Sequence, residues 1–149
     1  METILFVCCE SAVIDARTNS VSVFNIMEEL NAVNFPIVVQ RISAVLMLSR
    51  TEDEPQNLDL HIRITLSEQE LYNGPVAVSF HEHLTTRVVA DLIGLLIPAP
   101  GNLRIDVQDA GISHGHWTTR INRVGQLGPN VFPRMPPHAP PPEPVEPER

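Results

Sequence analysis

Apolar and polar residues alternate with a period of two along much of the chain. The clearest run is residues 58–66, where five aliphatic side chains alternate with four polar ones. Successive side chains of a strand point to opposite faces, so this run predicts a strand with one buried and one solvated face. Residues 103–108 alternate in the same way, and the Asp109-Ala110-Gly111 turn signal after them predicts a hairpin with residues 113–124.

Several other segments are expected strands. They are residues 3–9, 20–28, 37–49 and 76–81. In residues 82–97 the apolar positions also fit helical spacing, with Thr85 or Thr86 as an N-cap, but the recurring valine and isoleucine residues and Gly94 favour a strand. About eight strands without a dependable amphipathic helix between them predict an all-β fold, an antiparallel sandwich of the immunoglobulin-like or C2-like kind.

Proline is concentrated at the C-terminal end of the chain. Nine of the 14 prolines lie in residues 129–149. Proline lacks a backbone donor, so this region is not expected to join a helix or a sheet. We therefore expect a β-sandwich domain at residues 1–127 and a disordered, proline-rich tail at residues 128–149, which would serve as a spacer or as a ligand for another protein.

The charge balance argues against polyanionic partners. The 149 residues include 18 acidic residues and 10 arginines without any lysine, for a net charge of -8. Residues 1–128 carry -7 of this excess and the tail carries -1. A protein that binds nucleic acid or an anionic membrane needs clustered positive charge, so neither partner is expected. The lack of lysine also excludes a Schiff-base lysine and a P-loop lysine.

The cysteines and the N-terminal segment indicate a cytoplasmic protein. Cys8 and Cys9 are adjacent, so they cannot form the loop-closing disulfides of small secreted domains. In a strand they would face opposite sides, which favours buried small apolar residues over a redox pair. The N-terminal segment lacks the basic region of a signal peptide, and no apolar run approaches the roughly 18 residues that span a bilayer.

Four segments, in this order along the chain, mark strand entries and corners: residues 9–15, residues 19–26, the Phe35-Pro36 pair and residues 92–101. Their order resembles an uncharacterised family of small bacterial β-sandwich proteins, over roughly residues 4–124. The chain departs from that family at Asn25, where a glycine is common. The resemblance implies the sandwich fold and no established activity.

Two His-x-His elements are the strongest candidates for chemistry. They are His81-Glu82-His83 and His114-Gly115-His116. Residues i and i+2 of a strand share a face, so each element could present two imidazoles to one zinc ion, with Glu82 or Asp109 completing the ligand set. The alternative interpretation is that these are solvated histidines on a polar face, and the sequence does not show whether the two elements meet.

Other candidate groups favour structural roles. Ser113, His114 and Asp109 are the residue types of a catalytic triad, but neighbours on one hairpin cannot take the positions of nucleophile, base and orienter. Trp117, the single tryptophan, is expected in the core, on the face that it shares with Thr119.

These patterns favour a non-enzymatic protein-interaction or assembly module that needs no cofactor. Unpaired backbone groups at sheet edges can add a strand, so the expected partner is another protein or a second copy of the chain. The alternative is a metal-binding protein or metal-dependent enzyme that uses His81, His83, His114 and His116. A subunit of a phage-like or contractile particle would also suit a small sandwich.

Overall fold

The described part of the chain folds as strands alone. The computed structural model describes residues 1–18 and 20–125. This part contains nine strands and no helix, and therefore no helix that is long and apolar enough to cross a membrane. The strands are β1 (Glu2–Ile14), β2 (Val21–Ile26), β3 (Glu29–Ala32), β4 (Ile37–Ser49), β5 (Asn57–Leu66), β6 (Gln69–Ser79), β7 (Thr85–Ile97), β8 (Gly101–Asp109) and β9 (Ile112–Arg123).

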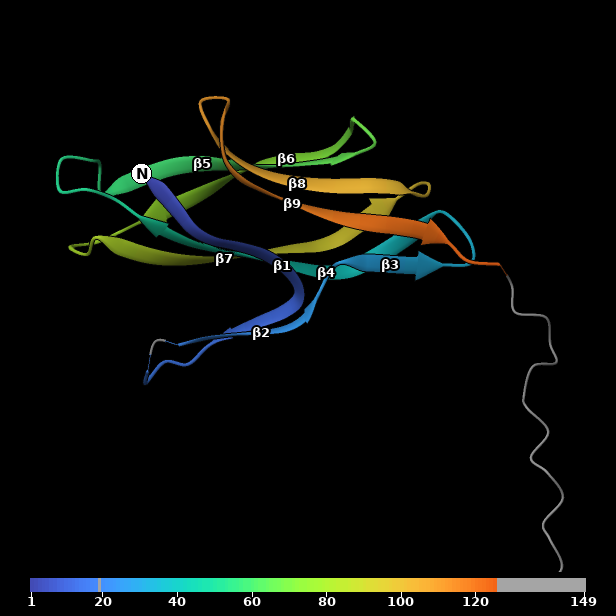
Figure 1. Cartoon of the computed structure of the whole chain (residues 1–149), viewed down its shortest axis with the longest axis horizontal. Coiled ribbons are helices and arrows are strands. Elements are labelled where there is room, and N and C mark those ends of the chain that lie inside the picture. The colour runs from blue at the N-terminus through green and yellow to red at the C-terminus, as the bar shows by residue number, and fades with distance from the viewer. Residues whose placement is uncertain (19, 126–149) are drawn as a thin grey trace, which may run out of the picture.

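The strands form two stacked sheets (Figure 1). Sheet A has the order β2-β1-β4-β7, and sheet B has the order β3-β9-β8-β5-β6. Neighbouring strands pair antiparallel, except that β3 and β9 pair parallel. The predicted all-β sandwich is confirmed, and the parallel pair is a departure from the wholly antiparallel arrangement that we expected.

The period-two alternation places one apolar layer between the sheets. On β5, Leu60, Ile62 and Ile64 are at most 1% exposed, whereas His61 between them is exposed. Burial of such an aliphatic side chain contributes about 1.5–3 kcal/mol. The buried layer consists of Leu60, Ile62, Ile64, Leu66, Val78, Phe80, Leu103, Ile105, Val107 and Ile121 on the sheet B side, and Cys8, Ile42, Ala44, Leu46, Leu48 and Ile97 on the sheet A side.

β7 and β4 change their inward face together at Gly94. The β7 side chains that pack on the core are Val88, Ala90 and Leu92 before this point and Leu95 after it. On β4, the inward side chains change from Ile42 and Ala44 to Ile37 and Val39. Gly94 has a φ of 72°, a backbone conformation that glycine adopts without the steric cost of a Cβ. The glycine thus lets both strands keep an apolar side chain inward.

The β1–β2 hairpin covers the other face of β4. A second buried cluster consists of Val7, Cys9 and Val45, with Ala12 and Val21 packed against it. β4 is therefore buried on both faces over residues 42–46. Beyond this cluster the hairpin bends away from the sandwich (Figure 1).

Trp117 ties β9 to the segment that follows β2. Its indole Nε1 donates a hydrogen bond to the carbonyl oxygen of Met27 at 2.8 Å, and Thr119 Oγ1 donates to the same oxygen at 2.7 Å. The Trp117 ring also packs against both buried clusters. The prediction that Trp117 is a core side chain on the face of Thr119 is confirmed.

The strands depart from the predicted positions at three points. β1 continues to Ile14, and β6 begins as early as Gln69. The pattern does not predict β3, because Leu30 is its only large apolar residue. The expectation of a strand rather than a helix within residues 82–97 is confirmed by β7. The predicted tail at residues 128–149 and the domain boundary at residue 127 lie outside the described residues.

Two isoleucine substitutions test the assignment of core and surface. Ile62 is 1% exposed and Ile93 is 77% exposed. We expect Ile62→Ala to lower the free energy of unfolding by about 2–5 kcal/mol, because it leaves a cavity, and Ile93→Ala to change it by less than about 0.5 kcal/mol. Urea unfolding of both variants beside the parent measures this difference, and equal losses would contradict the arrangement of the sheets.

Candidate functional site at the β6–β7 edge

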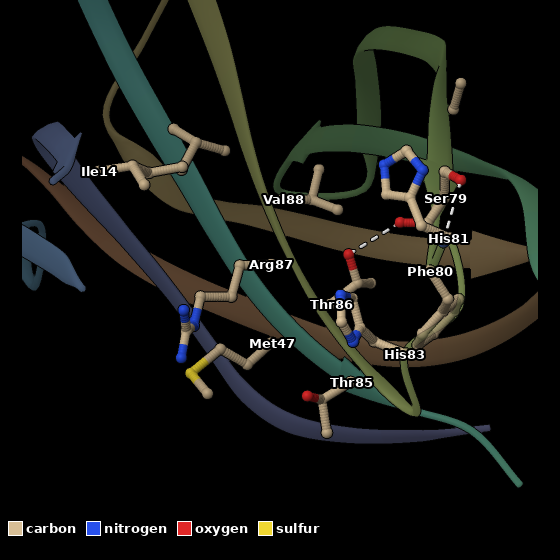
Figure 2. A pocket seen from close by; sticks show the side chains of 12 residues that line it. Ile14, Met47, Ser79, Phe80, His81, His83, Thr85, Thr86, Arg87 and Val88 are labelled. Carbon is tan, nitrogen blue, oxygen red and sulfur yellow. Dashed lines mark hydrogen bonds between the residues drawn. The ribbon is translucent and has the colours of Figure 1, made fainter. Parts of the chain in front are cut away.

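β6 is an edge strand of sheet B, β7 is an edge strand of sheet A, and the two lie on the same side of the sandwich. Two open depressions lie along the seam between them. The first has a volume of about 700 Å³, and both strands and the turn between them line it. Figure 2 shows this depression, with Arg87, Met47 and Ile14 on one side of β7 and Thr86 and Val88 on the other. The second has a volume of about 680 Å³ and lies near Tyr72 of β6 and Leu92 of β7. This seam is the candidate site.

The backbone of β7 directs unpaired groups away from β4. Opposite residues of an antiparallel pair alternate between those that exchange hydrogen bonds and those whose N–H and C=O groups point to the other side. Arg50 N donates to Leu84 O at 2.8 Å, so these two residues belong to the bonded kind. The register of β7 on β4 then runs without a shift. The residues whose backbone groups face the open edge are therefore Thr85, Arg87, Val89, Asp91 and Ile93.

The edge of β6 offers fewer free groups. Phe80 N donates to Gln56 O at 2.8 Å, so by the same alternation Asn73, Pro75, Ala77 and Ser79 direct their backbone outward. Pro75 has no N–H to offer. The carbonyl oxygen of Ser79 accepts a hydrogen bond from Thr86 Oγ1 at 2.9 Å (Figure 2). β6 is therefore blunted at its edge and joined to β7 near its end.

The outer face of β7 carries one charge of each sign. Asp91 accepts hydrogen bonds from Ser43 Oγ at 2.6 Å and from Arg41 Nη2 at 2.8 Å, both on β4. Arg87 lies four residues before Asp91 on the same face and also has an interaction within its own chain. Val89, between them, is half-buried, and Ile93 beyond them is largely exposed.

The first His-x-His element lies in the turn between β6 and β7. His81 has a φ of 51°, and its N–H donates to Ser79 Oγ at 3.3 Å. His83 N donates to Phe80 O at 2.9 Å, which closes the turn. Both histidines are exposed and line the first depression. The expected shared face of two strand residues does not apply here, because the segment is not a strand.

The second His-x-His element lies on β9, where the ladder is irregular. Val107 pairs with Gly115 and Gln108 pairs with Ser113, which leaves His114 as an extra residue between the two pairs. His114 is half-buried, and its buried Nε2 has no hydrogen-bond partner among the described residues. His116 is exposed and lies opposite Asp106. Within residues 1–18 and 20–125, no three His, Cys, Asp or Glu side chains form a cluster that could hold a metal ion.

Asp106 is the centre of the polar group beside His116. Its carboxylate accepts hydrogen bonds from Arg104 Nε at 2.6 Å and Arg104 Nη2 at 2.8 Å. Ser113 Oγ is 3.4 Å from the same carboxylate. The bidentate Arg104 contact, above all, holds the pKa of Asp106 below its ordinary value, and the nearby His116 and Ser113 act in the same direction.

The two cysteines are buried free thiols on opposite faces of β1. Cys8 packs into the layer between the sheets, and Cys9 packs into the second cluster. Burial raises the pKa of Cys8 to about 12, and burial likewise raises the pKa of Cys9. Both thiols therefore stay protonated near neutral pH, which fits the predicted packing role.

A comparison with protein families assigns the chain. A family model described as a family of unknown function, DUF6941, matches residues 4–121. The chain belongs to the DUF6941 family. No curated protein matches the chain. Membership in DUF6941 confirms the predicted resemblance to an uncharacterised family, and the matched residues include the whole β6–β7 edge.

Within this DUF6941 chain, Asn25 occupies a position with a special backbone conformation. Its φ is 55°, in the left-handed region that favours glycine and that asparagine tolerates better than most residues. Asn25 Nδ2 also donates to Glu10 Oε2 at 2.6 Å. The glycine that we expected to be common at this position has a physical reason in this backbone, and Asn25 satisfies the same requirement.

The Arg104–Asp106 pair predicts a pH dependence of stability. The pKa of Asp106 is lowered in the folded state, so the ionised carboxylate contributes stability above its unfolded pKa of about 3.9, and this is lost as the pH falls through the folded pKa. We expect Asp106→Asn to lower stability at pH 7 and to approach the parent below about pH 3. Urea unfolding from pH 7 to pH 2 measures this.

The matched control for this prediction is Asp59→Asn, at an exposed carboxylate on the neighbouring strand β5. A difference between Asp106→Asn and the parent that stays constant with pH would contradict the role of the ionised pair.

Proposed function

We propose that this protein is a non-enzymatic interaction module that binds an extended segment of another polypeptide by strand addition to β7. The observation that carries the proposal is the long edge of β7, along which alternate backbone groups face outward without a strand partner in the described part of the chain. Such groups form main-chain hydrogen bonds with an added strand, while the side chains beside them select its sequence.

The other edges of the two sheets support this choice. β2 has 6 residues and β3 has 4, which gives an added strand little length to pair with. β6 has 11 residues but contains Pro75. β7 has 13 residues and no proline. Natural proteins blunt exposed edges by shortness and by proline, and β7 carries neither of these protections.

The described side chains also support a role in binding. The Cys8 and Cys9 thiols are buried, and burial makes them hard to ionise. Free thiols also suit the cytoplasmic location that we propose. Ser113 Oγ faces the carboxylate of Asp106, which Arg104 already engages. The net charge of -7 over residues 1–128 favours a protein partner over nucleic acid or an anionic membrane.

Proline substitution at the two edges tests the proposal. Extended peptides are selected from a random library on the full-length chain. We expect Val89→Pro to abolish binding of the selected peptides, because it removes an outward N–H without breaking the ladder to β4. Asn73→Pro places a proline at an exposed, outward-facing position of β6 that lines neither depression, and it should leave binding unchanged. Fluorescence anisotropy with the labelled peptides measures both affinities.

Amide exchange gives the second measurement. Binding should slow the exchange of the Thr85, Arg87, Val89 and Asp91 amides, which NMR resolves one by one. Peptides that bind Val89→Pro as tightly as the parent, or that leave these four amides unprotected, would overturn the proposal.

A further inference from the structure

We propose that the segment added to β7 is the β7 of a second copy of this chain, paired antiparallel about a two-fold axis at Val89. This inference rests on the proposed function, because it names the partner for the same edge. The result is one continuous sheet that crosses both copies, with their β7 strands at its centre.

The charges on β7 select this register. With the axis at Val89, Arg87 of each copy lies opposite Asp91 of the other, so two pairs of opposite charge form across the interface. With the axis at residue 87 or residue 91, two like charges would lie directly opposite each other. Opposite charges on directly facing strand residues stabilise the pair, whereas like charges destabilise it.

The backbone selects the same centre independently. The regular edge begins at Thr85, where β7 starts, and ends at Ile93, because Gly94 has a φ of 72° and shifts the alternation. Val89 is the midpoint of this run. An antiparallel pair centred there uses the whole regular edge of both copies, and any displacement of the axis leaves outward groups of one copy without a facing residue.

The hydrogen-bond alternation also fits an axis at Val89. The outward-facing residues of β7 are odd-numbered, and a centre at Val89 places odd-numbered residues opposite odd-numbered ones. Val89 of the two copies then forms a bonded pair, as does each Arg87 with Asp91 of the other copy. Every outward N–H from residues 85 to 93 thus faces an outward C=O of the second copy.

Side chains on the outer face complete the match. Ile93, with 77% of its surface exposed, would lie opposite Thr85 of the second copy and would lose part of its contact with water. Asp91 is already held by Arg41 and Ser43 of its own chain, so its carboxylate is positioned before the second copy arrives. A carboxylate accepts several hydrogen bonds, so the partner contact adds to these bonds.

Charge reversal tests the register. We expect the full-length parent to form dimers in sedimentation velocity over a concentration series. Arg87→Asp and Asp91→Arg each place like charges opposite each other and should raise the dimer dissociation constant roughly tenfold or more. An equal mixture of the two variants restores both pairs of opposite charge, so it should form dimers that neither variant forms alone at the same concentration.

Arg63→Asp is the matched control, because it makes the same change of charge at a half-buried arginine on the outer face of sheet B, where Arg63 Nε pairs with Glu70 rather than with any residue of β7. It should dimerise like the parent. Circular dichroism melting of all variants checks their folding. Asp91→Arg loses the contacts with Arg41 and Ser43 and could unfold for that reason. Because Arg87 is exposed, the Arg87→Asp variant still tests the register in that case.

Two outcomes overturn the inference. One is a parent that stays monomeric throughout the concentration series, and the other is a dimer that is indifferent to Arg87→Asp. Neither outcome bears on the peptide selection described above, which asks whether β7 accepts any strand at all. Loss of the self-pairing is therefore distinguishable from loss of the proposed function.

Discussion

The hydrogen bonding and burial of β4 determine how the rest of the molecule is arranged. β4 pairs with β1 over residues 43–49 on one side and with β7 over its whole length on the other, so its backbone groups are satisfied within sheet A over residues 43–49. Over residues 42–46 its side chains are buried on both faces, by sheet B on one and by the β1–β2 hairpin on the other. Because a fully buried strand cannot leave backbone groups unpaired without a cost of about 1–3 kcal/mol each, β1 and β7 must flank it. β7 is thereby placed at an edge, with half of its backbone groups still available.

The edges of β6 and β7 differ in whether their outward backbone N–H and C=O groups are blocked. In β6, Pro75 removes a donor and Thr86 occupies the Ser79 carbonyl, so the edge is closed to regular pairing. In β7, the protection is electrostatic: Arg87 and Asp91 penalise an added strand that brings a like charge opposite either of them. A charged edge of this kind is selective, whereas a proline edge is simply blocked. The difference would let the proposed partner pair with β7 without every exposed strand doing so.

Much of the fold could be predicted from the sequence, and much of the candidate site could not. The alternation of residues 58–66 predicts β5 because one face of that strand is buried and the other is solvated. β4 matches the predicted residues 37–49. β3 escapes prediction since its pairing partner, β9, supplies its stability. The β6–β7 edge depends on strand order, which no local pattern contains. The two His-x-His elements differ from the expected strand geometry for a local reason: one lies in a turn and the other spans an irregular ladder, so neither has the regular alternation that the metal-site argument assumes.

Gly94 connects the requirements of the core with those of the edge. At this residue β7 must exchange one inward face for the other so that Leu92 and Leu95 both reach the apolar layer, and the φ of 72° permits this change. The same change ends the regular outward alternation of the backbone groups. The length of the regular β7 edge is thus set by core packing, through a residue at which an added Cβ would meet no atom within 4 Å. A side chain at position 94 would strain the backbone where the change of face occurs, so the extent of the regular β7 edge cannot vary independently of the packing that stabilises the sandwich.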